Sequence, residues 1–322
     1  MRPGTLCATA LIVIIAWSGI GVAQTKPTLH LIAVADTEDG LVGKEFGLNN
    51  EEIKRYAGSL AGTTDLVLDV KEIAGKDYSC SNINAAVKNL SAQPNDVVIF
   101  YHSGHGTSPK KDISDKAGSK FPSLQCTTDL TAALPNLEDI SNALRKKGAR
   151  LTITAADSCN RLPEQELAPL GKAAILPPRN RIRTMFLNFK GYILISGAST
   201  DEFAFYKRND SGEFTKQFLN ALDYPPNVKP ELLWQEVLDR ASKVLPTPNH
   251  AATPPEPPMQ EFQHPQHVEE LTYVPPVVVS NTANAVTARA AAPKALEADK
   301  PKTKKKKRKK KHHHVEETSR ND

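Results

Sequence analysis

The sequence predicts an α/β protein, a three-layer sandwich in which a mostly parallel central sheet lies between two layers of helices. Two observations lead to this fold class. Short runs rich in Val, Ile and Leu have the composition of strands buried on both faces, and helical periodicities separate one run from the next. Such alternation is typical of parallel sheets, because parallel strands need a crossover connection. The predicted strands are residues 29–35, 66–70, 96–101, 150–155 and 191–196.

The helices are predicted from apolar residues that recur every three or four positions and from residues that cap helix ends. The first is predicted to begin after the capping residues Asn49 and Asn50, the second after Ser81 and the third after Asn136. Gly148 is expected to stop the third helix. The remaining predicted helices are residues 214–222 and 230–245, the latter with a proline in its first turn.

The composition is that of a soluble globular protein with polar extensions. Of 322 residues, 39% are hydrophobic and 24% are charged, which argues against a wholly disordered or a membrane-spanning protein. Nine of the 41 basic residues lie within residues 302–311, so the net charge of +5 belongs to this run and the rest of the chain is acidic. The folded part is therefore not predicted to bind nucleic acid specifically.

The chain is predicted to have three parts. Residues 1–23 have a basic start, an apolar stretch and a small-residue cleavage site, which are the features of a secretory signal peptide. We therefore expect a secreted or periplasmic protein, with no transmembrane segment in the mature chain. Residues 24–245 form the predicted folded domain. Residues 246–322 are rich in Pro and Ala and then in Lys, so this tail is predicted to be disordered.

The lysine-rich run suggests one property of the tail. It would be attracted to anionic surfaces, and this attraction would weaken with salt. The alternative is that the charges of the tail are simply solvated and bind no partner. The three histidines at residues 312–314 are compatible with adventitious binding of a divalent metal.

Outside the predicted signal peptide the sequence has three cysteines, Cys80, Cys126 and Cys159. An odd number in an exported protein indicates one disulfide pair and one free thiol. The count alone does not say which cysteine is free.

Two polar motifs follow neighbouring predicted strands. The strand at residues 96–101 leads into HSGHG, which contains His105, and the strand at residues 150–155 leads into ADSCN, which contains Cys159. Ligands of open α/β sheets bind at the carboxyl ends of strands, so both side chains are expected at one edge of the sheet. A thiol needs a nearby imidazole to become an effective nucleophile. The two residues are therefore candidates for a catalytic pair.

The glycines around His105 fit the same hypothesis. A backbone without side chains approaches a substrate carbonyl closely, so the N–H groups of Gly106 and Cys159 are candidates for an oxyanion hole. The alternative is purely structural: a tight glycine turn, a loop histidine with its hydrogen bonds satisfied, and a buried thiol.

The motifs FYHSGHG and ADSCN resemble those of the caspase-like cysteine peptidases (peptidase C14), and are closer to metacaspases and their bacterial relatives than to animal caspases. The resemblance covers about residues 28–245, including a G-x-F-T motif at residues 212–215. It implies a caspase-haemoglobinase fold and a cysteine endopeptidase acting on peptides or proteins. His105 would take the thiol proton of Cys159 and later protonate the leaving amine. The resemblance implies no obligatory third catalytic residue.

The resemblance also implies a preference for Arg or Lys before the cleaved bond. Metacaspases bind these residues through an acidic residue two positions before the nucleophile, which is Asp157 here. Their pocket is completed by residues that correspond to Ser103 and Asp36. Asp157 would alternatively belong to a structural loop, and Asp36 would alternatively start the polar turn DTEDG.

The sequence departs from the metacaspase pattern D-x-C-H-S-G after the nucleophile, where Asn160 and Arg161 stand at the His and Ser positions and the Gly is also missing. This departure leaves two alternatives open: a catalytically silent module that binds peptides, or a peptidase in which Arg161 selects acidic residues. No cofactor is obligatory. Calcium activation occurs in the family, but no D-x-D-x-D-G loop is present and no ligands are assigned, so the metal site is unknown.

Assigning Cys159 as the nucleophile leaves Cys80 and Cys126 as a pair that either forms a structural disulfide or does not. The basic segment at residues 172–190 is a further open point. It would be a site of self-cleavage in an enzyme that prefers basic residues, or simply an exposed loop.

Overall fold

The computed structural model describes residues 26–108, 118–129, 132–160, 179–206, 209–223, 227–246 and 262–276. Residues 1–25 and 277–322 lie outside this set, so the predicted signal peptide, tail and lysine run remain predictions. No helix within the described residues has the length and apolar character that a membrane span requires.

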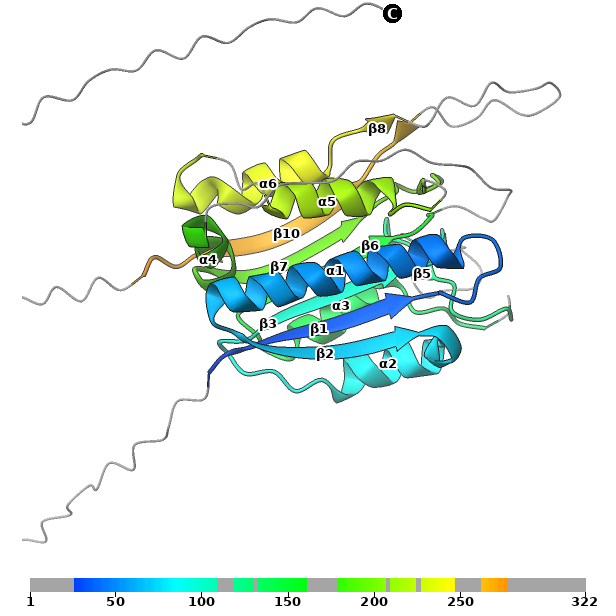
Figure 1. The fold of residues 1–322 in the computed structure, drawn as a ribbon, viewed down its shortest axis with the longest axis horizontal. Coiled ribbons are helices and arrows are strands. Elements are labelled where there is room, and N and C mark those ends of the chain that lie inside the picture. The colour runs from blue at the N-terminus through cyan, green and yellow to red at the C-terminus, as the bar shows by residue number, and fades with distance from the viewer. Residues whose placement is uncertain are drawn as a thin grey trace, which may run out of the picture. The chain divides into compact units, whose positions relative to one another are not determined.

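A six-stranded sheet with the order β10-β7-β6-β3-β1-β2 forms the centre of the fold (Figure 1). Five strands are parallel and β10 runs antiparallel to β7 at the edge, so the predicted three-layer α/β class is confirmed. The strands are β1 (Thr28–Ala35), β2 (Val67–Ala74), β3 (Val97–Ser103), β6 (Leu151–Asp157), β7 (Phe189–Ser196) and β10 (Gln266–Tyr273), with short pairs β4 (Gly106–Thr107) and β5 (Ser123–Leu124), and β8 (Leu245–Pro246) and β9 (Phe262–Gln263).

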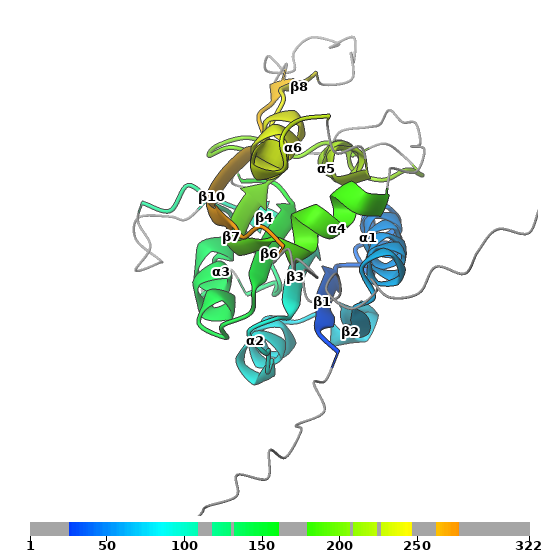
Figure 2. The same cartoon turned by 90° about the vertical axis from the view of Figure 1, so that its left-hand side faces the viewer.

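Helices cover both faces of the sheet, and the alternation of side chains along each strand explains why. In β3, Val97, Ile99 and Tyr101 pack toward one helix layer, while Val98 and Phe100 pack toward the other. Figure 2 shows α2 and α3 on one side and α1 and α4 on the other. The helices are α1 (Gly43–Thr64), α2 (Cys80–Asn89), α3 (Leu137–Arg145), α4 (Arg179–Leu187), α5 (Glu213–Asp223) and α6 (Leu233–Ala241), with 3₁₀ turns at Gly75–Asp77 and Pro230–Leu232.

Two of the predicted helix starts are wrong. Helix α1 begins at Gly43, and Asn49 and Asn50 are buried inside it, where their amides bond to other elements instead of capping the helix. The cap of α2 is Ser79 and not Ser81, because the Ser79 hydroxyl accepts the Asn82 N–H. The predicted cap Asn136 is confirmed for α3.

The folded domain also extends past the predicted boundary at residue 245. Strand β10 pairs with β7 along its whole length, and Leu271 and Tyr273 pack against the core. The sequence pattern did not indicate this strand, because many prolines precede it and because a half-exposed edge strand contains few apolar residues. The predicted disordered tail is therefore wrong for residues 262–276.

Helix α4 was not predicted, because its sequence between Arg179 and Leu187 is mostly polar. Ile182, Met185 and Phe186 bury one face of it against the core. The second half of the basic segment at residues 172–190 is therefore helix α4 and the start of β7, and Lys172 lies outside the described residues.

Candidate active site

The two motifs singled out in the sequence lie side by side, as predicted. Strands β3 and β6 are neighbours, with Ser103 opposite Asp157 at their carboxyl ends. The Gly104 N–H donates to the Asp157 carbonyl across the gap between them (3.4 Å). The chain segments that carry His105 and Cys159 therefore leave the sheet at the same edge.

The segment that carries His105 touches the backbone of Cys159. A Cβ atom placed on Gly106 would lie 2.3 Å from the Cys159 carbonyl oxygen, so only glycine fits at this position. Gly106 belongs to β4, which pairs with β5, and the His105 carbonyl accepts the Gln125 N–H at 3.0 Å. The predicted oxyanion donors, the N–H groups of Gly106 and Cys159, thus belong to segments in direct contact.

His105 has a partner that the sequence reasoning missed. Its Nε2 lies 3.1 Å from Asp39 Oδ2, and the Phe46 ring meets the imidazole edge-on. Asp39 Oδ1 accepts the N–H groups of Leu41 and Val42 at 2.8 Å, so the carboxylate is fixed at the entrance to α1. Burial opposes its charge, but these hydrogen bonds and His105 together lower the pKa of Asp39. The sequence indicated only that Asp39 lies in the polar loop after β1, at the edge of the sheet where His105 was expected.

Cys159 is the free cysteine among the described residues. Its Sγ lies 4.0 Å from the Ala204 carbonyl oxygen, and among the described residues no hydrogen bond joins it to the His105 imidazole. Burial raises the pKa of the Cys159 thiol to about 11, and the negative charge of Asp157 acts in the same direction. The thiol is therefore protonated at neutral pH and needs a base before it can attack a carbonyl.

The carboxylate of Asp157 is fully buried beneath this edge of the sheet. Its Oδ2 accepts both the backbone N–H (3.1 Å) and the hydroxyl (2.5 Å) of Thr215, in the first turn of α5. Its Oδ1 has no hydrogen-bond partner among the described residues. Burial raises the pKa of Asp157 to about 6, against the opposing effect of the Thr215 hydrogen bonds.

Ser103 is held beside Asp157 by Asn49 of α1. The Asn49 amide donates to Ser103 Oγ at 2.8 Å, and its oxygen accepts the Gly212 N–H at 2.7 Å. Gly212 also approaches the Asp157 carboxylate so closely that a Cβ would lie 2.1 Å from Oδ2. The G-x-F-T motif noted in the sequence therefore packs against this carboxylate, a role that the sequence reasoning did not assign.

Asp36 directly follows β1 at the same edge, and its backbone N–H donates to the Ser103 carbonyl (3.1 Å). Its side chain is half-buried. Burial, followed by the charges of Asp39 and Glu38, raises the pKa of Asp36, while His105 lowers it. The three predicted pocket residues, Asp36, Ser103 and Asp157, thus lie at the ends of three adjacent strands.

Asn160, which departs from the metacaspase pattern, is buried and bonded to neighbouring loops. Its side chain donates to the Lys120 carbonyl at 2.7 Å, and its backbone bonds with Glu202 and Asp201. Arg161 lies outside the described residues, so the alternative in which it selects acidic residues stays a prediction.

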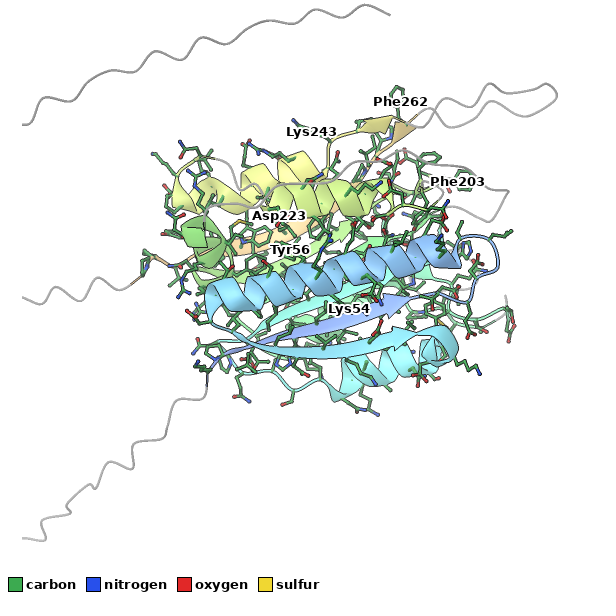
Figure 3. The ribbon with its side chains drawn as sticks, in the orientation of Figure 1. Lys54, Tyr56, Phe203, Asp223, Lys243 and Phe262 are labelled. Atoms are coloured by element: carbon green, nitrogen blue, oxygen red, sulfur yellow. A yellow bond between two sulfur atoms is a disulfide. The ribbon has the colours of Figure 1, made fainter. Side chains whose placement is uncertain are left out.

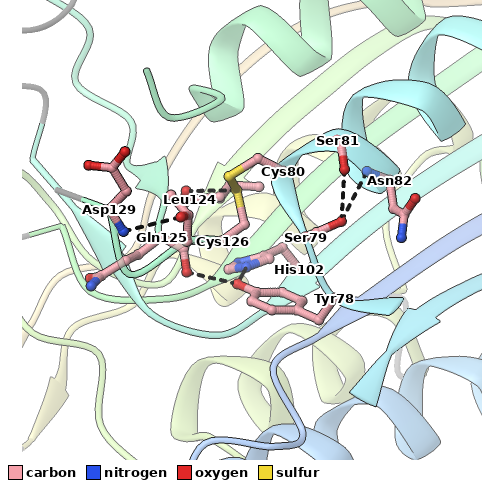
Figure 4. Close-up of a disulfide and its surroundings, with 11 residues drawn as sticks. Tyr78, Ser79, Cys80, Ser81, Asn82, His102, Leu124, Gln125, Cys126 and Asp129 are labelled. Carbon is pink, nitrogen blue, oxygen red and sulfur yellow. Dashed lines mark hydrogen bonds between the residues drawn. A yellow bond between two sulfur atoms is a disulfide. The ribbon is translucent and has the colours of Figure 1, made fainter. Parts of the chain in front are cut away.

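Cys80 and Cys126 form a disulfide, with Cα atoms 5.0 Å apart (Figure 4). The bond ties α2 to the segment after β5. Beside it, the Tyr78 hydroxyl donates to the Gln125 carbonyl and lies 3.0 Å from His102 Nε2. Because the Gln125 N–H bonds to His105, this cluster supports the segment that carries the histidine.

No group of three or more His, Cys, Asp or Glu side chains suited to a metal ion occurs among the described residues. Calcium activation therefore stays a prediction without assigned ligands.

Comparisons with known proteins connect this geometry to a family. A family model described as a caspase domain (peptidase C14) matches residues 52–273, more than half of the chain. The match ends with β10 and so includes the strand beyond residue 245. A crystal structure of a protein from Geobacter sulfurreducens is similar at 15% sequence identity with a TM-score of 0.39, over 76% of this chain and 93% of that one. A search of curated proteins found no match.

Proposed function

Because the chain belongs to the caspase-domain family of cysteine peptidases, we propose that it is an endopeptidase that uses Cys159 and His105. The observation that carries this proposal is the contact between the two segments at the edge of the sheet. No side chain fits between Gly106 and the Cys159 backbone, so the segments that carry the histidine and the thiol are in direct contact. The thiol and the imidazole are not hydrogen-bonded to each other among the described residues, which does not contradict the proposal because catalytic hydrogen bonds often form only when substrate binds.

In the proposed mechanism the His105 imidazole accepts the proton of the Cys159 thiol. The thiolate attacks the carbonyl carbon of the scissile bond, and the N–H groups of Gly106 and Cys159 stabilise the negative oxygen. The protonated His105 then gives its proton to the leaving amine as the C–N bond breaks. A water molecule, deprotonated by His105, hydrolyses the resulting thioester and regenerates the thiol.

Asp39 contributes to this mechanism by orienting His105. Its contact with Nε2 leaves Nδ1 as the ring nitrogen that exchanges a proton with the thiol. The negative charge of Asp39 also stabilises the imidazolium that forms after proton transfer.

We propose further that the enzyme cleaves after Arg or Lys. The support is the set of acidic and polar groups at the ends of β1, β3 and β6, namely Asp36, Ser103 and Asp157. Asp157 Oδ1, which has no partner among the described residues, offers an acceptor to a guanidinium or ammonium group. A cationic side chain beside Asp157 would also lower the pKa of this carboxyl and so stabilise its charged form.

Peptides with Arg, Lys or Asp before a fluorogenic leaving group test both parts of the proposal, assayed with and without calcium. The reductant is kept mild, because the Cys80–Cys126 disulfide must stay intact. We expect turnover of the Arg and Lys peptides, and its loss in Cys159→Ala. His105→Ala should lower kcat/KM by about a thousandfold. Turnover of the Asp peptide alone would contradict the specificity, and equal turnover by Cys159→Ala would contradict the nucleophile.

A catalytically silent peptide-binding module is the second candidate. The raised pKa of the Cys159 thiol and its bond to Ala204 instead of His105 favour it. Such a module would bind Arg peptides equally well with Cys159→Ala and would turn over none of them.

Export to an oxidising compartment is part of the proposal. The Cys80–Cys126 disulfide supports it, because such bonds persist outside the reducing cytosol. Fractionation of cells that express the full chain, with mass analysis of the mature N-terminus, tests cleavage after residue 23.

A further inference from the structure

The loop that borders Cys159 is fixed by a part of the chain far away in sequence. This loop, residues 197–206, follows β7, and its Ala204 carbonyl lies against the thiol. Ala204 and Tyr206 share a small apolar cluster with Cys159, and the Tyr206 hydroxyl donates to the Asp157 carbonyl at 2.6 Å. The position of the loop therefore determines the surroundings of both the thiol and Asp157.

Residues 262–266, which include β9 and the first residue of β10, form hydrogen bonds with this loop. Gln263 is fully buried, and its amide makes two hydrogen bonds at once. The oxygen accepts the Phe205 N–H at 2.9 Å, and the nitrogen donates to the Gly197 carbonyl at 2.7 Å. One side chain thus joins the start of the loop to the residue next to Ala204.

Two neighbours of Gln263 add further contacts with the same loop. The His264 N–H and ring bond to the Glu202 carboxylate at 2.9 and 2.6 Å, and Gln266 donates to the Ala198 carbonyl at 3.2 Å. Figure 3 shows Phe203 of the loop and Phe262, which begins the segment, at the same end of the molecule. The contact extends over most of the loop.

We propose that residues 262–266 are a brace for the active-site loop and that Gln263 is a positioning residue for Cys159. The inference rests on the proposed function of Cys159, but it concerns a segment beyond the domain boundary that the sequence suggested. Gln263 acts through Phe205 and Ala204, because its amide bonds to the Phe205 N–H while the Ala204 carbonyl lies against the thiol. Its amide satisfies two buried backbone groups, which would otherwise lose their partners.

The test compares Gln263→Met with Gln217→Met. Methionine preserves the volume of the side chain and removes both hydrogen bonds. Gln217 is the control, because its amide also bonds two backbone groups, the Ala241 and Lys243 carbonyls, neither of which belongs to residues 197–206. Circular dichroism and thermal unfolding establish that both variants are folded and how far each is destabilised.

Two readouts follow at a temperature where both variants are fully folded. We expect Gln263→Met to lower kcat by about tenfold with a smaller change in KM, because a displaced thiol reacts poorly once substrate is bound. We also expect iodoacetamide to alkylate its Cys159 several times faster than in the parent chain, because a loosened loop uncovers the thiol. Gln217→Met should match the parent protein in both measurements.

The two readouts separate this inference from the proposed function. Faster alkylation in Gln263→Met supports the brace even where the parent chain has no peptidase activity. Alkylation and kcat equal to those of Gln217→Met would overturn the brace, whether or not the parent chain cleaves peptides.

Discussion

The two segments that meet at the candidate site are held in different ways. The His105 side is fastened close to the histidine, by the short β4-β5 pair and by a disulfide between α2 and the segment after β5. The Cys159 side is fastened by hydrogen bonds from chain segments far along the sequence, namely α5 and residues 262–266. The His105 side depends on a covalent bond. The Cys159 side depends on segments that come later in the chain and must fold against it.

This difference has a functional meaning. In the proposed mechanism the base must keep its position relative to the nucleophile, and the disulfide close to His105 limits the movement of the segment that carries this residue. The thiol, by contrast, is surrounded by a loop whose supports are all non-covalent, so its environment is the more adaptable one. We therefore expect changes on the two sides to act differently on stability and on catalysis.

Removal of the disulfide is the change with the largest expected effect. The bond closes a chain separation of 46 residues, and the double variant Cys80→Ala/Cys126→Ala should lose about 4 kcal/mol of unfolding free energy. Urea denaturation measures this loss. Activity of the fraction that stays folded should fall as well, because Gln125 supports His105. Unchanged stability would show that the β4-β5 pair holds the His105 side without help from the disulfide.

Replacement of Asp157 by Asn tests the Cys159 side of the site. The folded-state pKa of about 6 exceeds the ordinary 3.8, so the folded chain holds an extra proton between these pH values and stability falls as pH rises through them. Asp157→Asn should remove this slope and be about 2–3 kcal/mol more stable than the parent chain near pH 7.

The same variant decides between the pocket and the structural interpretation of Asp157. If Asp157 belongs to the substrate pocket, Asp157→Asn should lose cleavage after Arg and Lys, while the Cys159 thiol of the variant should still react with iodoacetamide. The exposed Asp77 supplies the control, and Asp77→Asn should leave both the pH slope and the cleavage unchanged. If Asp157→Asn is more stable and fully active, the structural interpretation of Asp157 holds and the pocket interpretation is wrong.

The smallest expected effect belongs to Asp39→Asn. The amide keeps an oxygen for the Leu41 and Val42 N–H groups but carries no charge to stabilise the imidazolium. We expect kcat/KM to fall about tenfold with a melting temperature close to that of the parent chain. Steady-state kinetics and calorimetry measure the two quantities. A loss as large as that of His105→Ala would mean that Asp39 also holds the loop in place.

The sequence was most informative where short-range patterns decide the structure. Strands β1, β3 and β6 are buried along almost their whole length and are rich in apolar residues, so these strands and the shared edge of His105 and Cys159 were predictable. The expectation of burial on both faces is wrong for β2, which is a parallel strand but is mostly exposed. The partners of the site residues were not predictable. Asp39 bonds His105 from 66 residues away, and Thr215 bonds Asp157 from 58 residues away. Such pairs follow from tertiary packing, which no local periodicity reports.

The same limit explains the missed edge strand and the misplaced start of α1. The residues of β10 alternate between half-exposed and exposed, so their pattern carries little apolar signal. Asn49 and Asn50 resemble caps in sequence, but tertiary hydrogen bonds to Ser103 and Glu72 hold them inside the helix.

The antiparallel edge strand has a consequence for protein production. A recombinant fragment that ends near residue 245 would omit β10 and leave β7 with an unpaired row of backbone groups beside Ile193 and Ile195. Exposed apolar edges of this kind recruit further strands and aggregate. A fragment that extends through Tyr273 keeps β10 paired with β7. We expect this fragment, which is shorter than the full chain, to remain monodisperse at high concentration.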